Sequence, residues 1–139
     1  MIIGLGNDMV DIRRVGLTLR RQGKRFRARV FTPAEIALAD SRKGAKRIAT
    51  FATRFAAKEA AAKALGLGIR KGVQWRDLEI LNTPEGKPIL TLQGAALKRL
   101  QAITPEGMRA RVHVSLSDEY PYAWALVVIE AGVKIEALA

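Results

Sequence analysis

Residues 54–68 read RFAAKEAAAKALGLG, and this stretch decides the fold because it predicts the end of a long helix. Ala, Leu, Lys and Glu are strong helix formers, and nothing interrupts the run before Gly66. At helical spacing, Glu59 shares one narrow stripe with four apolar residues, namely Ile48, Ala52, Phe55 and Ala62. A carboxylate on an apolar stripe is costly unless a neighbour compensates it, so Glu59 needs an explanation.

Three explanations for Glu59 are open. It can form a salt bridge with Lys63, one turn further along the helix. The stripe can also reach the surface at this point. Alternatively, Glu59 faces a cleft and binds a cation, while Lys63 holds an anionic ligand beside it. In the third case Gly66 and Gly68 end the helix and let the backbone approach a ligand closely.

The composition predicts one basic domain. A chain of 139 residues, 49% hydrophobic, fits a single compact unit spanning 1–139. Its 24 Lys and Arg against 13 Asp and Glu give a formal charge of +11. Such a surface attracts polyanions, which include nucleic acid, an anionic membrane, an acidic protein or a phosphorylated cofactor. Because there is no cysteine, disulfides and thiolate metal sites are excluded.

The start of the chain does not resemble a signal peptide, because Asp8 and Asp11 interrupt its apolar run. No apolar run approaches the roughly 18–20 residues of a membrane span. We therefore expect a soluble cytoplasmic protein without a membrane partner.

Asp8 lies in a predicted first strand, residues 2–12, on the same face as Gly4 and Gly6. Two glycines ahead of an acid leave that face open. Asp8 is either a turn or capping aspartate or a second oxygen ligand for a cation at Glu59. Magnesium is commonly held by one or two carboxylates together with substrate phosphates and water.

Residues 13–29 hold eight basic side chains and no acid, and they begin with a predicted helix at 13–23. We interpret this basic arm as a docking surface for an acidic partner, against the alternative of a solvated face. Phe26 and Phe31 should anchor it to the core. A second basic cluster is either a solvated loop or a phosphate contact; its members are Arg42, Lys43, Lys46 and Arg47.

The remaining elements predict an α+β domain, with a mainly antiparallel sheet packed against the long central helix. Thr32 and Glu35 fit a capping box at the start of a short helix. The other expected elements are a loop at 69–76, strands at 77–81 and 88–92, a helix at 94–103, a strand at 111–117, a turn at 118–121, a well-buried strand at 122–130 and a frayed tail at 131–139.

Several common chemistries find little support. His113 is the only histidine, which argues against a zinc site and favours an ordinary strand residue over a catalyst. Ser115 and Ser117 have no adjacent base, so a nucleophilic serine is weakly supported. Neither a dinucleotide fingerprint nor a phosphate-binding loop is present.

Five motifs together resemble the holo-[acyl-carrier-protein] synthases. They are IGLGNDMVDI at 3–12, FTPAE at 31–35, RFAAKEAAAKALGLG at 54–68, GKP at 86–88 and HVSLS at 113–117. Each is moderately specific alone, but all five occur in order and cover nearly the whole chain. The resemblance implies a 4′-phosphopantetheinyl transferase-like fold.

The same resemblance implies transfer of 4′-phosphopantetheine from coenzyme A to a serine of apo acyl carrier protein, with release of adenosine 3′,5′-bisphosphate, in support of fatty acid biosynthesis. It implies a small cytoplasmic homotrimer with sites between protomers. Asp8 and Glu59 match the ligands of Mg²⁺, and Lys63 matches a lysine beside the pyrophosphate, so these three form the expected catalytic set. Arg14 and Arg21 match residues that grip the acidic carrier protein.

Coenzyme A is expected at a set of residues from the same motifs, namely Lys63, Gly66, Gly68, Lys87, Pro88 and Ser117. The attacking serine must lose a proton, and we predict that Glu59, or a water held beside it by the metal, accepts it. One position departs from the pattern: many relatives have histidine after the Ser-x-Ser/Thr stretch, where this chain has Asp118.

Two other functions compete with this hypothesis. The charge of +11 alone suggests a nucleic-acid-binding protein. That explains the basic arm but neither Asp8 nor Glu59, and the aromatic residues typical of single-strand binders are lacking, so we expect no nucleic acid partner. The second competitor is a non-catalytic adaptor that binds a carrier protein without a metal.

Overall fold

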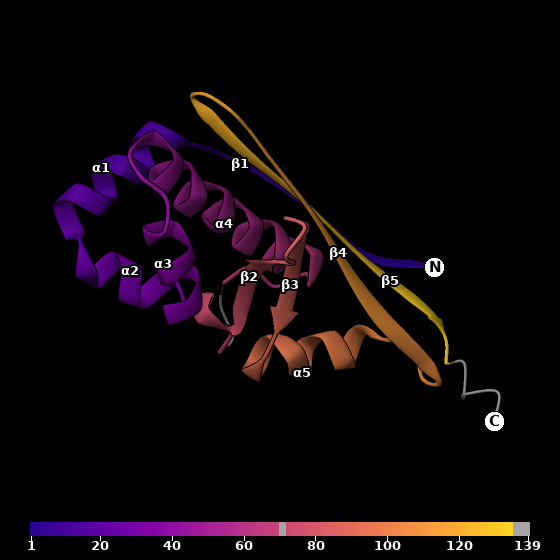
Figure 1. The fold of residues 1–139 in the computed structure, drawn as a ribbon. Coiled ribbons are helices and arrows are strands. Elements are labelled where there is room, and N and C mark those ends of the chain that lie inside the picture. Colours follow the sequence, from indigo (N-terminus) through magenta and orange to yellow (C-terminus); the bar gives the residue numbers. More distant parts are fainter. Residues whose placement is uncertain (70–71, 135–139) are drawn as a thin grey trace.

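The computed structural model describes residues 1–69 and 72–134. Figure 1 shows a layer of long strands with one long helix lying along it and the shorter elements gathered around that helix. In chain order the elements are β1 (Ile2–Asp11), α1 (Ile12–Gln22), α2 (Lys24–Val30), α3 (Pro33–Asp40), α4 (Ala45–Ala64), the 3₁₀ helix η1 (Trp75–Asp77), β2 (Leu78–Asn82), β3 (Pro88–Leu92), α5 (Gly94–Ile103), β4 (Met108–Glu119) and β5 (Tyr122–Val133).

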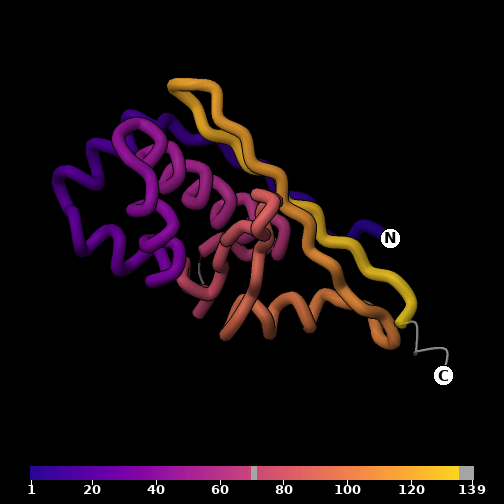
Figure 2. The backbone as a smooth tube through the Cα atoms, viewed as in Figure 1, coloured from indigo at the N-terminus to yellow at the C-terminus, as the bar shows by residue number. Residues whose placement is uncertain are grey.

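The long strands form an antiparallel sheet in the order β1-β5-β4, and β2 and β3 form a separate antiparallel hairpin. Figure 2 shows the N-terminus beside the far end of β5, where the Met1 ammonium donates to the Ala131 carbonyl at 2.8 Å. The predicted α+β class with a mainly antiparallel sheet is confirmed.

Helix α4 is the predicted central helix, and it is buried around most of its circumference. Its core face consists of alanines such as Ala56 and Ala60, which let β1 and β5 pack closely. Glu59 is only half-buried, so the predicted stripe lies at the margin of the buried surface. The side chain at the centre of the core is instead Lys58, which is fully buried.

The basic arm folds as two helices, because Gly23 ends α1 with a positive φ of 47° and α2 follows at once. Sequence analysis predicted only the first of them. Phe26 and Phe31 are buried and pack edge to face at 5.7 Å, which confirms their anchoring role. The capping box of Thr32 and Glu35 at the start of α3 is also confirmed.

Several predicted boundaries were wrong, and β4 begins at Met108 instead of Arg111. Asp77 belongs to η1, where its carboxylate accepts from the Gln74 amide at 3.0 Å. Asp118 lies inside β4, and only Tyr120 and Pro121 make the turn, since ladder pairing continues to Glu119 opposite Tyr122. Ala131–Val133 continue β5 instead of fraying. Residues 135–139 of the predicted tail, and 70–71 of the predicted loop, lie outside the described residues.

Strand β5 was predicted to be well buried, and this is also wrong. Its residues alternate, with Ala125 and Val127 buried but Trp124 and Leu126 more than 40% exposed. The reason is that α4 covers one face of the sheet only. Exposed Leu5 and Met9 of β1 join them, so the uncovered face carries an apolar patch, which we call the outer sheet patch: Leu5, Met9, Trp124 and Leu126.

None of the helices in the described part of the chain is long and apolar enough to cross a membrane.

Candidate active site

Asp8 and Glu59 meet where β1 passes over α4. Both line a cleft of about 320 Å³, together with Arg14 of α1 and Phe55 of α4. The Lys63 ammonium donates to the Asp8 carboxylate at 2.8 Å and to the Asn7 carbonyl at 3.0 Å. Lys63 thus pairs with Asp8, a residue 55 positions away, and not with Glu59 as a simple helical salt bridge predicts.

Two glycines make this meeting possible. A Cβ atom on Gly6 would overlap the carbonyl oxygen of Ala60, and one on Gly4 would overlap that of Ala64. Strand β1 therefore lies directly on the backbone of α4, at a separation that only glycine allows. Asp8, two residues beyond Gly6, is carried to the turn of α4 that holds Glu59.

The charges in this cleft are unbalanced. Burial raises the pKa of Glu59 to about 7; repulsion by Asp8 and a hydrogen bond between the two carboxyl groups add to the rise, and Lys63 opposes it. The hydrogen bond to Asp8 raises the pKa of Lys63. Two acids thus face each other, and the one cation bonded to them is committed to Asp8.

A small divalent cation fits this arrangement, because it would relieve the repulsion between Asp8 and Glu59. Within residues 1–69 and 72–134 there is no group of three or more His, Cys, Asp or Glu that could hold a metal alone. Mg²⁺ is commonly bound by only one or two carboxylates, with substrate phosphates completing its shell. The donor set therefore suits a metal that arrives with a phosphorylated substrate.

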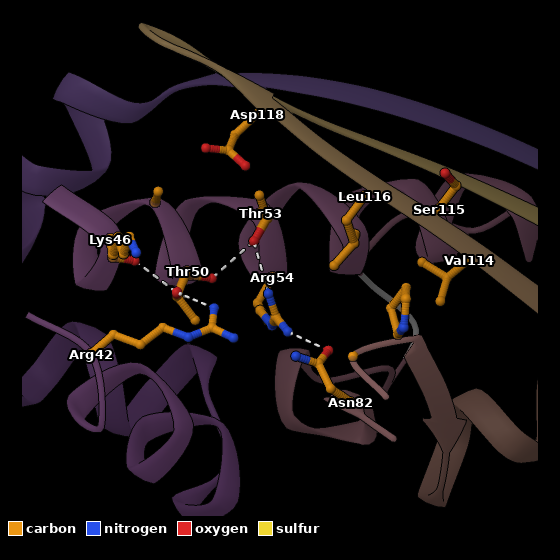
Figure 3. A pocket seen from close by; sticks show the side chains of 13 residues that line it. Arg42, Lys46, Thr50, Thr53, Arg54, Asn82, Val114, Ser115, Leu116 and Asp118 are labelled. Carbon is orange, nitrogen blue, oxygen red and sulfur yellow. Dashed lines mark hydrogen bonds between the residues drawn. The ribbon is translucent and has the colours of Figure 1, made fainter. Parts of the chain in front are cut away.

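A second, basic pocket of about 610 Å³ lies between the start of α4, the β2–β3 hairpin and β4 (Figure 3). Three cations and one acid line it, namely Arg42, Lys46, Arg54 and Asp118. The Arg42 guanidinium donates to the Thr50 hydroxyl at 2.8 Å. This part of the second basic cluster therefore faces a pocket, whereas Arg47 pairs with Asp40 at 2.8 Å.

Arg54 is the residue of this pocket that sequence analysis did not single out. It is buried, and its guanidinium donates to the Asn82 side chain at 2.7 Å and to the Thr53 hydroxyl at 3.1 Å. Its Nε finds no partner among residues 1–69 and 72–134. Burial, followed by repulsion from Arg42, lowers its pKa to about 10. In the sequence, Arg54 is the first residue of RFAAKEA, and an arginine at that position is equally typical of an exposed helix surface.

The comparisons with known proteins agree with this geometry. The family model of the 4′-phosphopantetheinyl transferase superfamily matches residues 4–125. A holo-[acyl-carrier-protein] synthase of Bradyrhizobium diazoefficiens is 53% identical over 94% of this chain and 96% of its own length. The chain therefore belongs to the holo-[acyl-carrier-protein] synthases, enzymes of the phosphopantetheinyl transferase superfamily.

Solved synthases share the fold. The crystal structure from Neisseria meningitidis is 38% identical with a TM-score of 0.79, over 94% of this chain and 99% of that one. The structure from Bacillus anthracis in complex with CoA (3′,5′-ADP) is 35% identical with a TM-score of 0.78, over 95% and 99%. The predicted family resemblance and the transferase class are thus confirmed.

The other predicted site residues of this synthase are dispersed. Gly66 and Gly68 follow α4 with positive φ angles of 78° and 67°. Pro88 lines the basic pocket, and Lys87 is exposed in the adjoining turn. Ser117 is exposed on β4, where its neighbours Leu116 and Asp118 line the pocket. Their contacts with coenzyme A stay predictions.

Arg14 and Arg21 are both exposed on α1, and Arg14 borders the acid cleft. His113 is exposed on β4 and its Nε2 lies 2.8 Å from the Glu130 carboxylate, which agrees with an ordinary strand residue in a cross-strand hydrogen bond.

Proposed function

We propose that this synthase transfers 4′-phosphopantetheine from coenzyme A to a serine of apo acyl carrier protein, with Mg²⁺ held by Asp8 and Glu59. The observation that carries the proposal is the convergence of Asp8, Glu59 and Lys63 from distant parts of the chain. The family match over 4–125 supports one transferase domain spanning 1–139.

In the reaction, the serine oxygen bonds to the phosphorus that carries pantetheine. The bond from that phosphorus to its bridging oxygen breaks, and adenosine 3′,5′-bisphosphate leaves with the bridging oxygen. Glu59 takes the serine proton, directly or through a water. Lys63 neutralises charge on the diphosphate. The metal, when bound, polarises the phosphoryl oxygens and steadies the leaving phosphate.

The basic pocket is the candidate site for the nucleotide end of coenzyme A. Among the described residues that line it, Arg42, Lys46 and Arg54 outnumber the one acid, Asp118, which favours a phosphorylated ligand. Gly86 and Pro88 form its rim, which supports the predicted role of the GKP turn.

The acid cleft and the basic pocket lie on different sides of α4 within one chain. Arg54 and Glu59 are five positions apart, which places them about 140° apart around the helix. One coenzyme A molecule between two copies could contact the acid cleft of one and the basic pocket of the other. The outer sheet patch of exposed apolar residues offers a surface for assembly. Both observations support the predicted homotrimer with sites between protomers.

The carrier protein is expected on the basic arm. Arg14 and Arg21 are exposed on α1, and α1 and α2 contain no acidic residue. Arg14 lies beside the acid cleft, so a partner bound there could present its serine to Glu59. We place this activity in the cytoplasm, in the supply of holo carrier protein for fatty acid biosynthesis.

Mass spectrometry tests the activity. Apo carrier protein, coenzyme A, Mg²⁺ and this protein should yield a phosphopantetheine adduct that disappears when a chelator is added. Absence of the adduct with Mg²⁺ present would contradict the proposal, and an adduct that persists with chelator would contradict the metal.

Complementation tests the shared site. Glu59→Gln and Arg54→Ala should each be inactive alone, but unfolding and refolding them as a mixture should restore part of the activity. Recovery is expected because one interface then combines an intact acid cleft with an intact basic pocket. Light scattering should give three times the chain mass. No recovery in mixed oligomers would place the whole site within one chain.

A further inference from the structure

Lys58 precedes Glu59 in α4, yet its side chain is directed into the core. Its ammonium lies 2.7 Å from the carboxylate of Glu35, and both side chains are at most 1% exposed. It also donates to the Trp75 carbonyl at 3.1 Å and to the Leu78 carbonyl. We call this the Lys58–Glu35 pair.

Both oxygens of the Glu35 carboxylate also accept hydrogen bonds. One of its carboxylate oxygens accepts from the Thr32 amide and the other from the Ile80 amide, each at 2.9 Å. The pair therefore joins α4 to the start of α3, to η1 and to β2 through directional contacts.

Stability alone does not explain such a pair. Removing two charges from water costs several kcal/mol per ion, and a well-packed apolar pair of similar size commonly stabilises a protein as much or more. An apolar pair, however, would hold α4 by non-directional packing only, whereas hydrogen bonds to fixed carbonyls and amides also define a direction. The property that this pair supplies is orientation.

The orientation matters because Glu59 is the next residue. With Lys58 fixed inward, Glu59 points about 100° away around the helix, toward Asp8. Phe55, one turn before Glu59, stacks on Trp75 at 5.0 Å, and the carbonyl of Trp75 accepts from Lys58. A rotation of about 10° would move a group about 6 Å from the helix axis by ~1 Å. A displacement of that size at a reacting centre can cost about 100-fold in rate.

We propose that the Lys58–Glu35 pair is a positioning device, which sets the rotation of α4 so that Glu59 and Lys63 meet Asp8 in the geometry that binds a divalent cation. Lys58 is a positioning residue, because the hydrogen bonds and the ion pair of its ammonium involve neither the Asp8 nor the Glu59 side chain. The inference rests on the proposed function for the identity of the metal site.

The test is the double variant Lys58→Met/Glu35→Gln, which removes both charges and keeps the side-chain volumes. Mn²⁺ serves as the probe, with its free concentration measured by electron paramagnetic resonance in the presence of coenzyme A and without carrier protein. We expect a lower urea midpoint, because the Trp75 and Leu78 carbonyls lose the Lys58 donor, together with Mn²⁺ affinity about tenfold weaker and kcat/KM for transfer about 10- to 100-fold lower.

Thr32→Val is the matched control. It removes the side-chain cap of α3 and the hydrogen bond from the Thr32 hydroxyl to Glu79 at 2.6 Å, but keeps both side chains of the pair and the Thr32 amide that donates to the Glu35 carboxylate. This variant should have a lower urea midpoint and wild-type Mn²⁺ affinity. If the pair were purely structural, Mn²⁺ affinity would fall only in step with the urea midpoint, in the double variant and in Thr32→Val alike.

Wild-type Mn²⁺ affinity in the folded double variant would overturn the proposal. If the double variant does not fold, Glu35→Asp decides, because it keeps the charge but shortens the side chain. Weaker Mn²⁺ binding in that variant supports the proposal, and unchanged binding overturns it. Failure of wild-type protein to modify a carrier protein would contradict the proposed function, while the Mn²⁺ comparison would still decide the role of the pair.

Discussion

Two adjacent residues of α4, Lys58 and Glu59, show two ways in which a protein places a charge. Lys58 is fully buried, and its ammonium contacts a carboxylate and two carbonyl oxygens. Glu59 is half-buried beside another acid, and Lys63, the nearby cation, is bonded to that other acid. The charge of Lys58 is balanced by Glu35, whereas the two acids at Glu59 leave room for the cation that we propose. The contrast separates a charge that organises the fold from a charge that is available for chemistry.

The largest effect should come from Glu59→Gln. Removing one of the two proposed metal ligands, which is also the proposed proton acceptor, should lower kcat/KM about 1,000-fold, equivalent to ~4 kcal/mol of transition-state stabilisation. Folding stability should not fall, because the substitution removes the repulsion between Glu59 and Asp8 and glutamine can keep the hydrogen bond to Asp8. Transfer kinetics and urea unfolding measure the two quantities. Near-normal turnover with Mg²⁺ would remove Glu59 from the chemistry.

Lys58→Ala should lower folding stability, the property that Glu59→Gln leaves unchanged. It leaves the Glu35 carboxylate buried without its cation, which typically destabilises a protein by about 3–5 kcal/mol. Urea or thermal unfolding should show this loss before any assay is run. A stability within about 0.5 kcal/mol of wild type would mean that water or another cation reaches Glu35, and Lys58 would no longer count as the charge that balances it.

Gly6→Ala tests what brings the two regions together. A methyl group there collides with the Ala60 carbonyl, so β1 must move away from α4 and carry Asp8 with it. We expect a destabilisation of about 1–3 kcal/mol, as in overpacked cores, with a greater loss of metal affinity than the stability change explains. Gly132→Ala is the control, because its Cβ would meet nothing within 4 Å. Equal metal affinities in the two variants would contradict the role given to the close approach.

The smallest effect should come from Asp118→Ala. This acid lines the basic pocket without a metal role, so its removal makes the pocket more favourable to a phosphate. The KM for coenzyme A should fall about twofold, a change typical of one exposed charge, with kcat unchanged. A large loss of kcat would instead give Asp118 a direct function where many relatives have histidine.

Local signals predicted much of the fold correctly. The ends of α5, the capping box at Thr32 and the termination of α4 near Gly66 depend on neighbours within a few residues, which sequence displays directly. The errors fell where long-range pairing overrides local preference. Asp118 has turn propensity but continues β4 because Asp118 faces Ala123 in the ladder. The alternation of buried and exposed residues in β5 could not be seen in the sequence, because the buried alanines and the exposed aromatic residues are both apolar.

The sequence by itself determined the family and the α+β class, and it pointed to Asp8 and Glu59 as candidate site residues, because motif order and helical spacing are properties of the chain. Only the tertiary structure decided which charge meets which. Lys63 pairs with Asp8, Lys58 reaches Glu35, and Arg54 faces a pocket on another side of α4 from Glu59. Those partners lie tens of residues apart, and their meeting depends on how β1, α3 and the β2–β3 hairpin pack on one helix.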